Sequence, residues 1–146
     1  MTSLVDDQLV NYTKSKINSK GVLTYSFQKR SLPSYFRSRA NEILSEIDDR
    51  LDGVTFKKVK GQADLIINNG ELPPGAGGAA VWTGARWEIR LPENLFSTTT
   101  FRHEVGHVLG LNHAPLGANS LMQPEPNGVF DFTKKDWRAL ESVWGA

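Results

Sequence analysis

FRHEVGHVLGLNH, residues 101–113, contains all three histidines of a chain of 146 residues. On an α-helix, positions i and i+4 lie on one face about 6 Å apart along the axis, so His103 and His107 can present nitrogens to one ion. Gly110 can adopt the left-handed conformation that ends a helix, which would turn His113 toward the same ion. The stretch therefore predicts a helix, a glycine turn and a metal site made of three imidazoles.

The same residues predict which kind of metal site this is. Three neutral imidazoles leave the fourth position of a tetrahedral zinc ion open, which is typical of catalytic zinc rather than structural zinc. Glu104 directly follows the first ligand, so its carboxylate can flank the open position, accept a proton from zinc-bound water and later donate it to a leaving amine. A lone histidine is more often an ordinary hydrogen-bonding residue, and Glu104 alone would be a solvated helix residue. The combined spacing favours the metal site.

The pattern HExxHxxGxxH resembles the motif of the metzincin clan of zinc peptidases. Every position of that motif is matched, by His103, Glu104, His107, Gly110 and His113. SLMQP, residues 120–124, is similar to the Met-turn of the clan, a tight turn beneath the metal, with Met122 as its methionine. The alternative is that Met122 only fills space in the core, as a flexible thioether can do anywhere.

Among metzincins the chain is most similar to the matrixins, the catalytic-domain type of the matrix metalloproteinases, over residues 21–145. Trp144 and Gly145 stand where the last matrixin helix ends in tyrosine and glycine, and Asp136 falls where matrixins carry the second of two paired aspartates. Asp136 is equally well explained as an acidic residue in the first turn of a helix. The resemblance implies a zinc-dependent endopeptidase that hydrolyses peptide bonds with a metal-activated water and Glu104 as general base.

The resemblance also implies how a substrate binds. An extended protein or peptide segment is expected to pair with an exposed edge strand formed by Gly78, Ala79, Ala80, Val81 and Trp82. A side-chain pocket is expected beside the zinc, with Thr99, four residues before the first ligand, on one side and the segment Pro124–Asn127 on the other. Because Thr99 is small, we expect this pocket to accept an apolar side chain after the scissile bond.

The chain departs from the matrixins in several features. Every histidine already belongs to the motif, so the structural zinc of matrixins is not expected, and one zinc per chain is. Residues 68–85 contain Glu71 as their only carboxylate, so a calcium site is not expected either. Ala114 replaces the serine that often follows the third histidine, no cysteine is available for a cysteine switch, and no tyrosine follows Met122 as in the astacins and serralysins.

Composition narrows the remaining classes of function. The formal net charge of +1 gives no basic surplus for binding nucleic acid. No apolar run is long enough to cross a membrane. Charged residues interrupt each candidate signal peptide in the first 30 residues, namely Asp6, Asp7, Lys14, Lys16 and Lys20. The compartment stays open, since matrixins are usually extracellular and this sequence shows no leader.

Hydrophobic periodicity predicts an α+β chain in which strands and helices alternate. The resemblance implies a metzincin-like arrangement of these elements, with a twisted, mixed five-stranded sheet, two long helices and a small C-terminal subdomain with one helix. The strands are expected at residues 22–27, 54–60, 63–68, 79–83 and 86–92. Helices are expected at 33–51, with Ser31 or Ser34 as its cap, over the histidine motif, and at 133–144, where Thr133 and Asp136 form a capping-box pattern. Residues 1–20, with weak helical spacing over 3–18, are expected to be an N-terminal extension. The catalytic domain would span 21–146, with an upper lobe at 21–112 and a lower lobe at 113–146.

Two other functions fit the same motif. The chain could be a zinc-binding structural or binding component of a larger assembly with little proteolytic activity, an alternative that the missing leader favours. It could also be an amidase that acts on cell-wall peptides, because the motif does not distinguish among amide bonds. Replacing Glu104 separates an enzyme from a binding component, since the replacement leaves all three imidazoles in place.

Overall fold

The computed structural model describes residues 21–28, 32–70, 72, 74, 76–92, 97–115, 117–124 and 127–145. Within these residues the chain has an α+β fold with a mixed sheet of five strands and three helices, as expected. The expected N-terminal extension and its weakly helical segment 3–18 lie outside the described residues. None of the described helices is long and apolar enough to cross a membrane.

The sheet has the strand order β2-β1-β3-β5-β4. Its strands are β1 (Val22–Phe27), β2 (Thr55–Lys58), β3 (Leu65–Asn68), β4 (Ala79–Trp82) and β5 (Trp87–Arg90). β1, β2, β3 and β5 run parallel, whereas β4 pairs antiparallel with β5 and forms one edge of the sheet. All five expected strands are present, although several are shorter than the sequence pattern indicated.

Helix α2 (Ser34–Arg50) packs one face against the core, because its apolar residues recur every three or four positions. Its buried residues are Phe36, Ala40, Ile43, Leu44 and Ile47. The expectation that Ser34 caps this helix is wrong, since Ser34 is its first helical residue and Pro33 stands at the cap with no side-chain hydrogen bond. The fixed φ of proline suits this position, and the other candidate cap, Ser31, lies outside the described residues.

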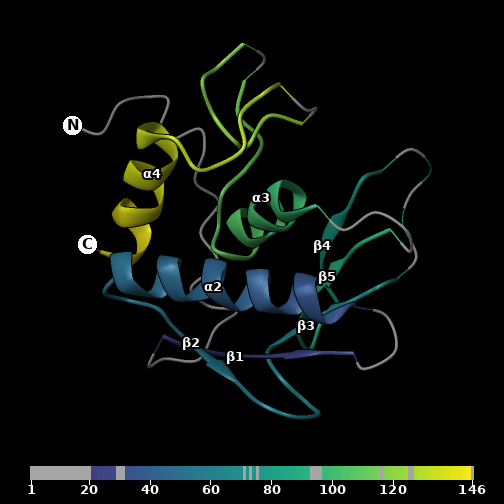
Figure 1. Cartoon of the computed structure of the whole chain (residues 1–146). Coiled ribbons are helices and arrows are strands. Elements are labelled where there is room, and N and C mark those ends of the chain that lie inside the picture. Colours follow the sequence, from purple (N-terminus) through teal and green to yellow (C-terminus); the bar gives the residue numbers. More distant parts are fainter. Residues whose placement is uncertain are drawn as a thin grey trace.

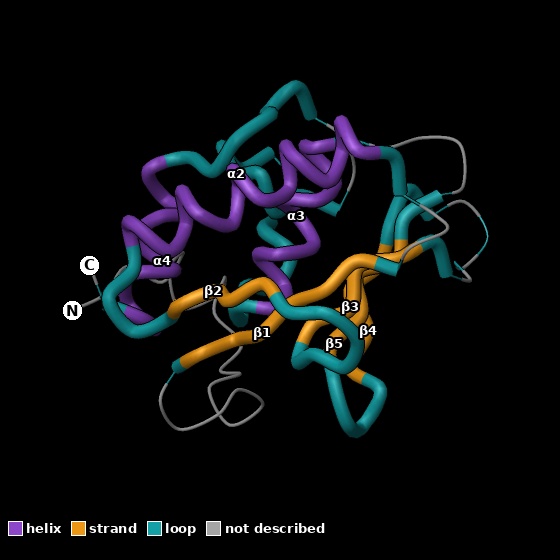
Figure 2. Tube along the Cα trace, turned by 60° about the horizontal axis from the view of Figure 1, so that its bottom comes forward, coloured by secondary structure: helices purple, strands orange, loops and turns teal. Residues whose placement is uncertain are grey.

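Helix α3 (Thr98–Val108) carries the first two histidines and lies on the same side of the sheet as α2 (Figures 1 and 2). The Ser97 side chain accepts a hydrogen bond from the Thr100 backbone N–H and so caps the first turn of α3. The rings of Phe36 in α2 and Phe101 in α3 meet edge to face with centroids 5.7 Å apart. This contact fixes α3 against a helix that is itself packed on the sheet.

Helix α4 (Lys134–Trp144) begins with the expected capping box, in which Thr133 and Asp136 bond each other's backbone. Its buried Trp144 donates a hydrogen bond from Nε1 to the carbonyl oxygen of Leu109 at the end of α3, over 2.8 Å. The Trp144 carbonyl in turn accepts a hydrogen bond from the Gly53 backbone N–H. The buried apolar residues of α4 belong to the same hydrophobic cluster as those of the sheet, α2 and α3.

Candidate metal centre

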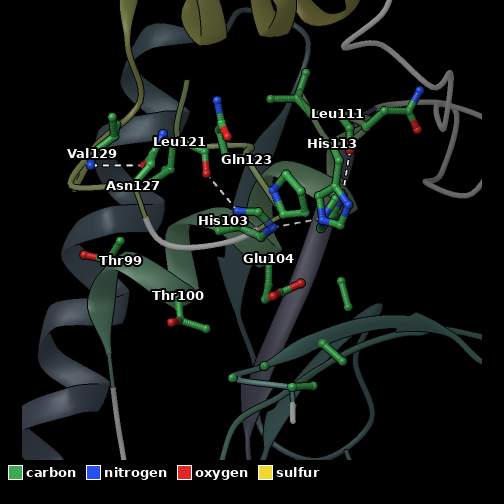
Figure 3. Close-up of a pocket in the computed structure, with 18 of the residues that line it drawn as sticks. Thr99, Thr100, His103, Glu104, Leu111, His113, Leu121, Gln123, Asn127 and Val129 are labelled. Carbon is green, nitrogen blue, oxygen red and sulfur yellow. Dashed lines mark hydrogen bonds between the residues drawn. The ribbon is translucent and has the colours of Figure 1, made fainter. Parts of the chain in front are cut away.

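The three histidines converge on one point at the end of α3. Their nearest ring nitrogens all lie within 4.8 Å of one another. His103 and His107 stand one turn apart on α3, and His113 follows the turn that ends the helix (Figure 3). Among the described residues, this is the group of three or more histidine or carboxylate side chains that is close enough to hold one metal ion.

A glycine turn brings the third histidine to the other two. Gly110 has a φ of 108°, which places it in the left-handed region. Its N–H donates to the His107 carbonyl over 3.1 Å, and the Leu111 N–H donates to the Gly106 carbonyl over 2.9 Å. These two bonds form a Schellman motif, which uses up the last helical carbonyls while the chain reverses. The turn predicted from the sequence at Gly110 is confirmed.

Backbone carbonyls orient the two helical imidazoles. His103 Nδ1 lies 2.8 Å from the carbonyl oxygen of Leu121, and His107 Nδ1 lies 2.7 Å from that of Leu111. A carbonyl oxygen can only accept a hydrogen bond, so both Nδ1 atoms carry the proton and both Nε2 atoms keep a lone pair. Histidines that bind metals are commonly held in this way by a partner on the second nitrogen.

The two lone pairs point at each other, which makes a cation the natural occupant. The Nε2 atoms of His103 and His107 lie 3.1 Å apart. A shared proton would turn one ring into an imidazolium, but burial lowers the pKa of both rings, that of His107 to about 4. Burial also lowers the pKa of the more exposed His113. The arrangement therefore fits a divalent cation held by neutral imidazoles.

Glu104 lies beside this cluster with its carboxylate turned toward β4 (Figure 3). It is 7% exposed, and burial raises its pKa to about 7, partly offset by a hydrogen bond with the backbone of Ala80. A β-carbon added to Gly78 would lie 3.4 Å from Glu104 Oε2 and 2.6 Å from Thr100 Cγ2. The absence of a side chain at Gly78 thus allows the chain leading into β4 to approach α3 closely.

The turn that contains Met122 supports both ligand-bearing segments. Met122 is fully buried, and its Sδ would lie 2.7 Å from a β-carbon added to Gly106 on α3. The Met122 carbonyl accepts a hydrogen bond from the N–H of Ala114, the residue after His113, over 2.8 Å. Leu121, one residue earlier, provides the carbonyl that orients His103. Met122 therefore packs against the part of α3 that carries the two helical histidines.

Asp136 connects this turn to helix α4. Its fully buried carboxylate accepts hydrogen bonds from the Ser120 hydroxyl, from the Leu121 N–H over 2.8 Å and from the Thr133 N–H over 3.0 Å. The sequence allowed two interpretations of Asp136, an acidic residue in the first turn of a helix or the second of the paired aspartates of the matrixins. The contacts confirm the position in the first turn of α4, and the same carboxylate also bonds the turn that contains Met122.

A cavity of about 790 Å³ opens over the histidines and Glu104. Of the residues expected to contact substrate, those that line it are Gly78, Ala79, Ala80, Thr99, Pro124 and Asn127. Val81 and Trp82, farther along β4, are not among its lining residues. The sequence did not predict that the far wall continues through Gly128, Val129 and Phe130. Its only signal is that the apolar pair Val129 and Phe130 stands between Asn127-Gly128 and Asp131.

Known proteins provide no independent assignment for this site. No protein-family model matches the chain, and no curated protein matches it at a significant level.

Proposed function

We propose that the chain is a zinc-dependent endopeptidase. The observation that carries the proposal is the convergence of three imidazoles with a buried glutamate in one cavity beside an edge strand. In a tetrahedral zinc site with bonds of 2.0–2.1 Å, two ligand nitrogens are about 3.3 Å apart. The 3.1 Å between His103 Nε2 and His107 Nε2 supports this fit.

His103, His107 and His113, which line the cavity, would hold the ion through three neutral nitrogens. When bound, zinc supplies Lewis acidity and makes a water molecule acidic near neutral pH. Glu104 then acts as the proton carrier, because its carboxylate is buried in the cavity wall next to the cluster. It takes a proton from water on Oε and delivers it to the nitrogen of the leaving amine.

Strand β4 provides the surface for an extended peptide. It forms the edge of the described sheet, and its residues Ala79 and Ala80 line the cavity together with Glu104. A peptide added to this edge would bond through its backbone, which requires no particular sequence. Selectivity would come from the cavity between Thr99 and Val129, which favours an apolar side chain at the position after the cleaved bond.

The deciding experiment replaces Glu104 with alanine. Glu104→Ala should keep the fold and the zinc, because all three imidazoles remain, but should lose about two to four orders of magnitude in peptide hydrolysis. The measurement compares zinc content and casein cleavage for the native chain and the variant. Glu42→Gln serves as the control, because Glu42 is an exposed glutamate on α2 whose loss should change neither quantity.

Three results would contradict the proposal. If the zinc-loaded native chain cleaves neither casein nor a broad peptide library, a zinc-binding component of a larger assembly becomes the better description. If cleavage is confined to cell-wall peptides, the chain is an amidase of that class. Equal cleavage by the native chain and Glu104→Ala would assign the activity to a contaminant.

A further inference from the structure

Residues 127–130 line the outer wall of the cavity, and the segment 127–132 that contains them is held at both ends. At the start, Asn127 donates from Nδ2 to the Ser120 carbonyl over 3.2 Å and accepts from the Val129 N–H over 3.2 Å. At the end, Phe132 is buried, and its ring meets that of Trp137 in α4 with centroids 5.3 Å apart. Between these anchors, Phe130 is 71% exposed and lines the cavity.

The middle of this wall is held by one side chain from α3. The guanidinium of Arg102 donates to the Phe130 carbonyl and pairs with Asp131 Oδ1, each over 3.5 Å. Its remaining terminal nitrogen lies 3.5 Å from Glu46 Oε2 on α2. The Arg102 side chain is only 13% exposed and is not among the described residues that line the cavity, so it stands behind the wall.

Arg102 thus connects three parts of the molecule, namely α3, α2 and the segment 127–132 beside the cavity. It precedes the first metal ligand on α3, reaches α2 through Glu46 and holds the outer wall through Phe130 and Asp131. A planar guanidinium can bond several acceptors at once in a fixed geometry, which lysine cannot do. Within the part of the chain that the structure describes, the Phe130 backbone makes no other hydrogen bond that would keep its side chain over the cavity.

We propose that Arg102 is a positioning residue that holds Phe130 as the outer wall of the side-chain pocket, and that Phe130 selects the apolar side chain bound there. This inference rests on the proposed function, because the ligand is anchored by zinc beside the pocket. Glu104 is the only described cavity-lining residue with an acidic or basic side chain other than histidine, and it lies at the metal end. The wall opposite Thr99 is therefore uncharged, with Val129 and Phe130 as its apolar residues, and its distance from Thr99 depends on Arg102.

Loss of Arg102 should widen the pocket without unfolding the chain. Glu46 and Asp131 are about half exposed, and ion pairs of that exposure contribute little to global stability. The phenyl ring of Phe130 would then close less firmly on a bound side chain. A large apolar side chain should lose affinity, whereas a methyl group, which is too small to reach the outer wall, should not.

The test uses two peptide hydroxamates that chelate zinc and differ only in the side chain beside the chelating group, isobutyl or methyl. Their Kd values are measured by calorimetry on the zinc-loaded full chain, so no turnover is needed. The native chain should favour isobutyl, and Arg102→Met should reduce that preference by about fivefold or more with the methyl Kd unchanged. Asp131→Asn, a second variant that removes the loop partner, should act in the same direction.

Controls separate positioning from general damage. Glu46→Gln removes the contact with α2 but leaves both loop contacts, so it should keep the native preference. Arg102→Lys should restore part of the preference. Amide hydrogen exchange at Val129 and Phe132, measured without ligand, should speed up in Arg102→Met and remain native in Glu46→Gln. Native Kd ratios in both Arg102→Met and Asp131→Asn would overturn the proposal, as would unchanged exchange in this loop.

Failure of the proposed function would look different. A chain that takes up no zinc would bind neither hydroxamate, yet hydrogen exchange would still report whether Arg102 holds the loop. Zinc uptake and hydroxamate binding without peptide cleavage would leave the pocket measurement intact while rejecting the endopeptidase.

Discussion

Glu104 illustrates how far a single residue could be understood from its neighbours in sequence. Its spacing from the histidines predicted a carboxylate beside the metal, and the structure places it in the same cavity wall as His103, His107 and His113. What the sequence could not show is the nearby backbone of Gly78 and Ala80, which buries the carboxylate. Burial follows from the arrival of β4, a segment more than twenty residues away along the chain.

The pKa of Glu104 predicts how stability depends on pH in the metal-free chain. Burial raises this pKa from 4.5 to about 7. A raised carboxyl pKa contributes stability below pH 4.5 that is lost as the pH rises through about 7. Glu104→Gln keeps the shape of the side chain but cannot ionise. The free energy of unfolding of the variant minus that of the native chain should therefore increase by up to about 3 kcal/mol as the pH rises from 4.5 to 8.

Urea denaturation of both metal-free proteins across this pH range measures that difference. The histidines titrate in both proteins, so their contribution largely cancels. Added zinc should shrink the difference, because a nearby cation favours the ionised carboxylate. A difference that stays constant with pH would show that Glu104 ionises as an exposed glutamate does.

Met122 provides a second prediction at this scale. Met122→Leu conserves volume and should cost roughly less than 1.5 kcal/mol of stability. Met122→Lys would bury a charge against Gly106 and should sharply lower folded yield or zinc occupancy. Thermal unfolding and zinc content test both variants. Native values for Met122→Lys would place this side chain on the surface and remove the Met-turn from the interpretation.

At the scale of elements, periodic patterns predicted which helices and strands are present, but they did not predict where each element begins and ends. Helix α2 and the five strands were predicted because buried positions recur with regular spacing. The strand expected at 54–60 is Thr55–Lys58, since the ends of a strand depend on partners in β1 rather than on local sequence. The prediction that Ser34 caps α2 was wrong for a related reason. A serine near the start of a helix caps it only where the backbone geometry brings its hydroxyl within hydrogen-bond distance of a free backbone N–H.

The turn after α3 gives a prediction for an element boundary. Gly110 has a φ of 108°, so Gly110→Ala should cost about 1–3 kcal/mol and move His113 away from the other ligands, weakening zinc binding. Gly61→Ala is the matched control, because Gly61 has a φ of 83° and lies in the turn before β3 with open space around it. It should cost similar stability and leave zinc affinity unchanged. Competition titration with a chromogenic chelator measures the affinity. Equal zinc affinity in both variants would mean that the Schellman turn is not needed to position His113 for zinc binding.

At the scale of the whole molecule, the site depends on contacts that sequence spacing does not encode. The three ligands and Glu104 were identifiable because they fall within one short motif. Phe130 and Val129 were missed because they reach the cavity only after α4 has fixed the returning chain through Asp136 and Phe132. Local patterns therefore indicated which residues form the candidate metal site, whereas the shape of the cavity follows from tertiary packing.

This dependence predicts how zinc affects unfolding of the entire chain. The ligands come from α3 and from the segment after it, and both are packed into one hydrophobic cluster with α4, so zinc should bind the folded chain far better than the unfolded one. At a free zinc concentration of 100 times Kd, the native chain should gain about 2.7 kcal/mol of unfolding free energy. His113→Ala should gain much less at the same concentration, because two imidazoles make a poor site. Elemental analysis should return one zinc per native chain, and calorimetric melting with and without a chelator measures the gain. An equal rise in melting temperature for the native chain and His113→Ala would mean that zinc binds somewhere other than the three histidines.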